Sequence, residues 1–76
     1  METAELDRLQ DEYRAAVDVW VRTIREEEAL ASNAEHGEAE IDAWELAHDA
    51  EEKARKHAKH AKSAYEDALR RKFFNF

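Results

Sequence analysis

The residues "SNAEHG", positions 32–37, decide the fold, because they hold the only glycine of a 76-residue chain that has no proline. The rest of the chain is rich in strong helix formers such as Ala, Glu, Lys, Arg and Leu. Gly37 could end a first helix in a left-handed conformation, whereas Ser32 and Glu35 could form a capping box that starts a second helix early. Both interpretations predict a turn within residues 32–38. A single uninterrupted helix is the rival, since an isolated glycine costs a helix only about 1 kcal/mol.

The periodicity before the break predicts a first helix over residues 3–31, with Thr3 as its N-cap. Its apolar residues recur at spacings of three and four and form one stripe about 100° wide. Glu27 intrudes on this stripe near the turn, and we interpret it as a carboxylate that reaches solvent while Trp44 covers it. The stripe consists of Leu6, Leu9, Tyr13, Ala16, Val17, Trp20, Ile24 and Ala31.

The second helix is predicted over residues 38–72, and its stripe is mostly alanine. Small side chains allow a neighbouring helix to approach closely, so we expect an all-α, two-helix antiparallel hairpin. This hairpin sets Trp20 and Ile24 near Ala47 and Ala50, and Leu6 near Ala61 and Tyr65. The stripe consists of Ala43, Leu46, Ala47, Ala50, Ala54, Ala58, Ala61, Ala64, Tyr65, Ala68 and Leu69.

Charged residues make up 41% of the chain and the formal net charge is −7, but 43% apolar content argues against disorder. Residues 34–52 contain eight acidic and no basic side chains, whereas residues 53–76 contain eight basic and two acidic ones. This gradient suits the dipole of the second helix and places its basic half beside the acidic start of the first. It therefore needs no external partner. The acidic balance disfavours nonspecific nucleic-acid binding, although a nucleic-acid-associated protein using the basic half of the second helix is a second alternative.

Several classes of protein are disfavoured by what the sequence lacks. Without cysteine there can be no disulfide or thiolate metal site, and no apolar run approaches the roughly 20 residues of a membrane span. Neither a nucleophile arrangement nor a glycine-rich phosphate loop is present. We therefore expect a cytoplasmic protein that is not an enzyme, needs no cofactor and does not bind membranes.

The segment "WELAHDAEEKARKHAKH", residues 44–60, raises the question of a metal site. Glu45-x-x-His48, extended by Glu52, has the letters that carboxylate-bridged, ferritin-like proteins direct into a helical bundle. Measured from the alanine stripe, however, these three side chains point outward. We therefore predict no metal site and a solvated charged face, and keep a ferritin-like metal-binding protein as the alternative. The predicted (i, i+4) ion pairs of this face are Asp49–Lys53, Glu51–Arg55 and Glu52–Lys56. His57 lies nearer the stripe and is predicted to pack opposite Tyr13.

The aromatic tail, residues 73–76, holds three phenylalanines that are costly to leave in water. A second subunit, an anionic membrane surface or another protein could cover them, or the tail could fray. A two-helix hairpin is rarely stable alone, and two hairpins make a four-helix bundle. We therefore expect a self-associating interaction or structural protein, a coiled-coil-like homodimer that could also bind an unidentified protein. Its predicted interface consists of Trp20, Ile41, Trp44, Tyr65, Leu69, Phe73, Phe74 and Phe76.

Overall fold

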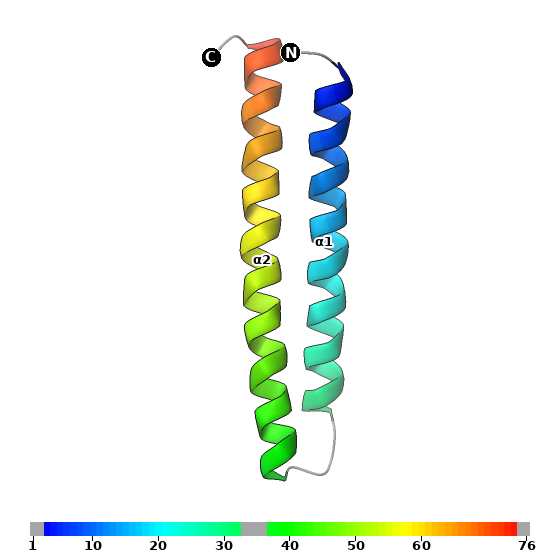
Figure 1. Cartoon of the computed structure of the whole chain (residues 1–76), viewed down its shortest axis with the longest axis vertical. Helices are drawn as coiled ribbons and strands as arrows, with labels where there is room; N and C mark the ends of the chain where they lie inside the picture. The colour runs from blue at the N-terminus through cyan, green and yellow to red at the C-terminus, as the bar shows by residue number, and fades with distance from the viewer. Residues whose placement is uncertain (1–2, 33–36, 75–76) are drawn as a thin grey trace.

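The computed structural model describes residues 3–32 and 37–74, which form two long antiparallel helices (Figure 1). Helix α1 spans Thr3–Ala31 and helix α2 spans Glu38–Phe73. The start of α1 and the end of α2 lie at the same end of a rod that measures 55 × 17 × 13 Å. The predicted all-α hairpin is confirmed, and the single uninterrupted helix is wrong. Phe73, predicted to belong to the tail, is the last residue of α2.

The residues around the turn differ from both predicted capping schemes. The backbone N–H and the hydroxyl of Ser32 both donate to the carbonyl oxygen of Glu28, at 3.0 and 2.9 Å. Ser32 therefore ends α1 instead of starting α2, because its N–H and its short hydroxyl both reach the carbonyl oxygen one turn back. Gly37 is the N-cap of α2 with φ −77° and ψ 170°, so the left-handed conformation predicted for it is also wrong. Residues 33–36 of the predicted turn lie outside the described residues.

The core is thin and consists mainly of alanine. Within residues 3–32 and 37–74, the buried side chains are Leu6, Ala16, Ala54, Ala58 and Ala68. Ala58 and Ala68 retain 2% and 0% of their accessible surface. Alanines at these positions let the helices approach closely, as the sequence predicts. No large side chain is fully buried in the described part of the chain, so little apolar surface supports this hairpin.

The contact between the helices follows a seven-residue repeat, which we call the seam. Spacings that alternate between three and four keep one line of side chains facing the partner helix, as in a coiled coil. The line passes through Glu27 in α1 and Glu51 in α2, both half-buried. The α1 seam is Leu6, Leu9, Tyr13, Ala16, Trp20, Thr23, Glu27 and Leu30, and the α2 seam is Ala47, Glu51, Ala54, Ala58, Ala61, Tyr65 and Ala68. The half-buried Ala43 precedes the repeat, four residues before Ala47.

The seam corrects part of the predicted stripes. Leu46 is 70% exposed, and Ala50 and Ala64 are exposed as well. The predicted stripe ran through alanines, whereas the seam runs through Glu51, whose carboxylate accepts a hydrogen bond from the Trp20 indole at 2.9 Å. Two residues of the predicted α1 stripe, Ile24 and Ala31, are likewise exposed.

Two side-chain contacts define the register of the two helices. Trp20 donates to Glu51, the residue after the predicted neighbour Ala50, and Thr3 accepts a hydrogen bond from Lys72 at 3.2 Å. The first contact agrees with the predicted placement of Trp20 near Ala47 and Ala50.

Ion pairs contribute little between the helices. The Lys and Arg pairs of the described residues lie within single helices, as in the exposed contact between Arg8 and Glu12 at 2.7 Å. The basic residues 53–62 of α2 form no ion pair with another described residue. The basic half of α2 is therefore not neutralised by direct contacts with the acidic start of α1.

Candidate functional site

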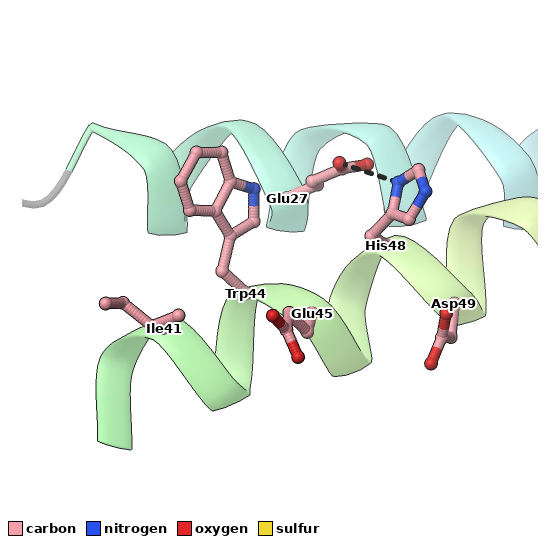
Figure 2. Close-up of a pocket in the computed structure, with 6 residues that line it drawn as sticks. All are labelled: Glu27, Ile41, Trp44, Glu45, His48 and Asp49. Carbon is pink, nitrogen blue, oxygen red and sulfur yellow. Dashed lines mark hydrogen bonds and ion pairs between the residues drawn. The ribbon is translucent and has the colours of Figure 1, made fainter. Parts of the chain in front are cut away.

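An open cavity of about 560 Å³ lies at the turn end of the hairpin. Glu27 comes from α1, and the other lining residues come from successive turns of α2 (Figure 2). Trp44 lies on the turn side of Glu27, and His48 lies on the other side (Figure 2). The cavity is lined by Glu27, Ile41, Trp44, Glu45, His48 and Asp49.

His48 joins the two helices through its ring. Its Nδ1 lies 3.2 Å from Oε1 of Glu27 on α1, and its Nε2 lies 3.2 Å from Oε1 of Glu52 on α2. The contact with Glu27 has hydrogen-bond geometry, and both contacts are ion pairs only when the ring is a positively charged imidazolium. The arrangement therefore favours a positive charge at this position.

The surroundings of His48 raise its pKa above the ordinary value of 6.5. The hydrogen bond with Glu27 is the largest cause, and the charges of Glu52, Glu27 and Glu51 act in the same direction. Partial desolvation opposes them by disfavouring the charged ring. Protonation of His48 therefore strengthens a contact between the helices.

Glu51 is the site residue that sequence reasoning assigned to the wrong surface. It was interpreted as the partner of Arg55 on a solvated face, but it lies half-buried in the seam and accepts the Trp20 indole N–H at 2.9 Å. The available signal was its position, four residues after Ala47 and three before Ala54. A polar residue at a seam position needs a partner, and Trp20 provides one.

Only part of the sequence-predicted metal set comes together. His48 and Glu52 are in contact, whereas the Glu45 carboxylate points away from Glu27 and His48 (Figure 2). Glu27, His48 and Glu51 converge instead, with one possible ligand atom from each within 4.8 Å of the others. Two of these residues come from α2 and one from α1, a combination that motif spacing on one helix does not reveal.

The predicted ladder of (i, i+4) ion pairs on this face is absent from the described residues. The predicted pairs are Asp49–Lys53, Glu51–Arg55 and Glu52–Lys56. In none of them do the two side chains form an ion pair with each other. Glu51 and Glu52 contact Trp20 and His48 instead. The face is thus more organised than the predicted solvated surface.

His57 does not pack in the core. It is exposed and lines a shallow groove with His60, Val19 and Ala64. Tyr13, its predicted partner, lines a groove with Ala58 and Lys59. The prediction is wrong because it centred the α2 stripe on alanines that the seam leaves exposed.

The predicted interface residues divide into two sets. Trp20, Tyr65 and Leu69 are half-buried within the hairpin. The exposed set consists of Ile41 (45%), Trp44 (40%), Phe73 (64%) and Phe74 (65%). The Lys72 ammonium lies 5.7 Å from the centroid of the Phe73 ring. Phe76 lies outside the described residues.

Neither described helix combines the length and apolar character that crossing a membrane requires. Comparisons of the chain with protein-family models, with curated proteins and with solved structures find no match.

Proposed function

We propose that this chain is a small structural or interaction protein that self-associates as a homodimer, in which two hairpins form a four-helix bundle. The observation that carries the proposal is the contrast between a core made mostly of alanine and a surface that holds most of the large apolar side chains. In the described residues, eight such side chains are more than one-third exposed. They are Val19, Val21, Ile24, Ile41, Trp44, Leu46, Phe73 and Phe74.

The accessible surface area of the chain supports an interface of standard size with a second copy. The chain exposes 5874 Å², whereas a compact monomer of 8.9 kDa exposes about 4800 Å². The excess of about 1000 Å² is close to the roughly 800 Å² that each partner contributes to a standard protein interface. A second copy of the chain therefore accounts for the surplus surface.

One side of the hairpin is the better candidate for the interface, and we call it the apolar flank. Val17 and Ile24 of α1 stand seven residues apart, and Ile41 and Leu69 of α2 are the apolar ends of a line of heptad positions that also holds His48, Arg55 and Lys62. Residues at a fixed heptad position lie along one line of a coiled-coil helix. Val17 lines a groove with Lys62, which is seven residues before Leu69, so the two lines border the same side of the seam.

The charge gradient of α2 favours an antiparallel arrangement of the two copies. From Glu38 to Glu52 the helix has seven acidic and no basic side chains, and from Lys53 to Phe73 it has eight basic and two acidic ones. Parallel copies would place acid on acid. Antiparallel copies place the acidic turn end of one hairpin beside the basic end of the other, where residues 53–62 have no ion-pair partner among the described residues.

The proposal is tested by comparing Ile41→Gln with Leu46→Gln in sedimentation equilibrium. Ile41 is 45% exposed on the apolar flank, so covering it contributes about 1 kcal/mol in each chain, or about 2 kcal/mol in a symmetric dimer. Ile41→Gln should therefore raise the dimer Kd by about 30-fold.

Leu46 provides the matched control. Leu46 is more exposed, at 70%, but it lies on another line of α2. It stands 14 residues, or two heptads, before His60, which lines the groove on the opposite side of the seam. Leu46→Gln should leave the dimer Kd unchanged. A larger effect at Leu46 than at Ile41 contradicts the assigned flank, and monomeric wild-type protein contradicts the proposed function.

A further inference from the structure

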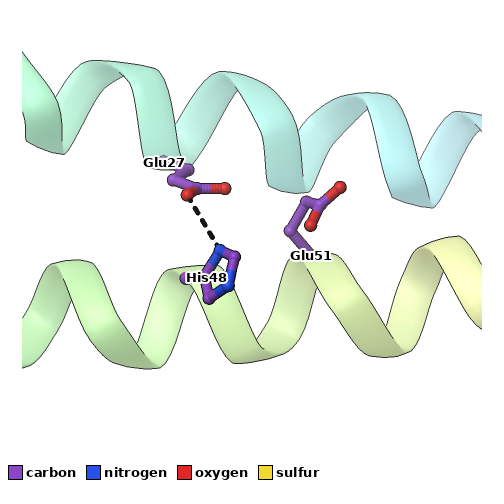
Figure 3. Close-up of side chains that lie close together, drawn as sticks. All are labelled: Glu27, His48 and Glu51. Atoms are coloured by element: carbon purple, nitrogen blue, oxygen red, sulfur yellow. Dashed lines mark hydrogen bonds and ion pairs between the residues drawn. The ribbon is translucent and has the colours of Figure 1, made fainter.

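Glu27, His48 and Glu51 meet between the two helices, where each offers one ligand atom within 4.8 Å of the others (Figure 3). We propose that these three residues bind a divalent first-row transition-metal ion such as Zn²⁺. All three ligands come from one chain, so the set can form in a monomer, although His48 stands seven residues after Ile41 and therefore lies on the apolar flank.

The first pair of ligand atoms already has the separation that a shared ion requires. Oε1 of Glu27 and Nδ1 of His48 are 3.2 Å apart. Two ligands of a tetrahedral ion at about 2.0–2.1 Å from the metal stand about 3.4 Å apart. Glu51 offers a third ligand atom within 4.8 Å of the other two, and the Trp20 indole N–H donates to its Oε1.

The groups behind the ligands resemble the outer shell of a metal centre. Oε1 of Glu52 lies 3.2 Å from Nε2 of His48 and favours a proton on that nitrogen. The lone pair of a neutral ring then lies on Nδ1, which faces Glu27. A carboxylate on the distal nitrogen of a ligating histidine fixes its tautomer and orientation in this way. The Trp20 indole N–H donates to Glu51 and fixes the orientation of its carboxylate.

The ligand chemistry selects the class of ion. One imidazole nitrogen with two carboxylate oxygens suits borderline ions such as Zn²⁺ or Fe²⁺, whereas Ca²⁺ and Mg²⁺ prefer oxygen alone. A double positive charge also relieves repulsion among Glu27, Glu51 and Glu52. Three protein ligands leave coordination positions for water, and the His48 side chain is 53% exposed in the single chain, so an ion can enter the monomer from solvent.

The test is isothermal titration of Zn²⁺ into chelator-treated full-length protein, with Mg²⁺ as the control ion. We expect one Zn²⁺ per chain and no Mg²⁺ binding at the same concentrations. Glu27→Gln, His48→Gln and Glu51→Gln should each raise the Zn²⁺ Kd by about tenfold or more, since each removes a ligand. Far-UV circular dichroism of each metal-free variant checks that the hairpin still folds.

Two matched variants separate this site from other metal-binding arrangements of the chain. Glu45→Gln and His60→Gln should leave the Zn²⁺ Kd unchanged. Loss of binding in Glu45→Gln with normal binding in Glu27→Gln would overturn the proposal in favour of the Glu45-x-x-His48 motif. Loss in His60→Gln would assign the ion to the His57–His60 pair, and no binding at millimolar Zn²⁺ would eliminate the site.

Nitrogen-15 NMR of the histidine rings provides a readout that needs no variant. Zn²⁺ should shift Nδ1 of His48 and leave its Nε2 protonated. A shift confined to Nε2, or to another histidine, contradicts the proposed ligand set.

Discussion

Leucine substitutions at two alanines of α2 can distinguish the seam from the alanine stripe. Ala58 retains 2% of its surface between the helices, whereas Ala50 is exposed although the stripe included both. Ala58→Leu inserts three carbon atoms where the helices approach closely, and such overpacking costs about 1–3 kcal/mol. A chain of this length has a free energy of unfolding of about 4–11 kcal/mol, so the loss is a substantial fraction.

Thermal unfolding followed by circular dichroism measures the difference. For a domain of this size each 1 kcal/mol shifts Tm by about 4–8 °C, so Ala58→Leu should lower Tm by about 4–24 °C. Ala50→Leu has the same change in helix propensity and should stay within about 0.5 kcal/mol of wild type. Equal losses at both positions, or a larger loss at Ala50, would refute the seam.

The remaining predictions concern the polar contacts at the turn end. Because the pKa of His48 is raised above 6.5, its contribution to stability should be fully present below pH 6.5 and lost as pH rises through the folded-state pKa. In metal-free protein, NMR titration should therefore place the midpoint of His48 above 6.5, and Glu27→Gln should lower it. An unchanged midpoint would contradict the hydrogen bond as the main cause. Trp20→Phe removes the donor to the half-buried Glu51 carboxylate and should lower the free energy of unfolding by about 1–3 kcal/mol. In a double-mutant cycle, additive effects of Trp20→Phe and Glu51→Gln would mean that the two side chains do not interact.

The sequence predicts the hairpin because local rules and the overall pattern agree. The chain has no proline, its single glycine lies between two periodic segments, and each segment has an apolar stripe. Antiparallel packing of two such helices turns the apolar stripe of each toward the other. These features depend on spacing and composition, which a single sequence contains in full.

The candidate site was harder to predict because it depends on register. Angles measured from an assumed alanine stripe place His48 in solvent, and the (i, i+4) spacing to Arg55 places Glu51 there. The shift of the seam toward Glu51 changes the surroundings of both residues. Glu51 can occupy the seam because Trp20, 31 residues away, donates to it. Glu27 was recognised as an intruder in the first stripe, but its contact with His48 follows only from the observed alignment of α1 and α2. Pairings across helices are not encoded in the spacing along either one.

Antiparallel self-association is tested most directly by one interchain distance. The chain has no cysteine, so Glu38→Cys at the exposed start of α2 gives a single spin label per chain. Double electron–electron resonance should then report a distance approaching the 55 Å length of the hairpin, because antiparallel copies place the two labels at opposite ends. A distance comparable to the 17 Å width would contradict the antiparallel arrangement, and the absence of any interchain dipolar signal would contradict the dimer itself.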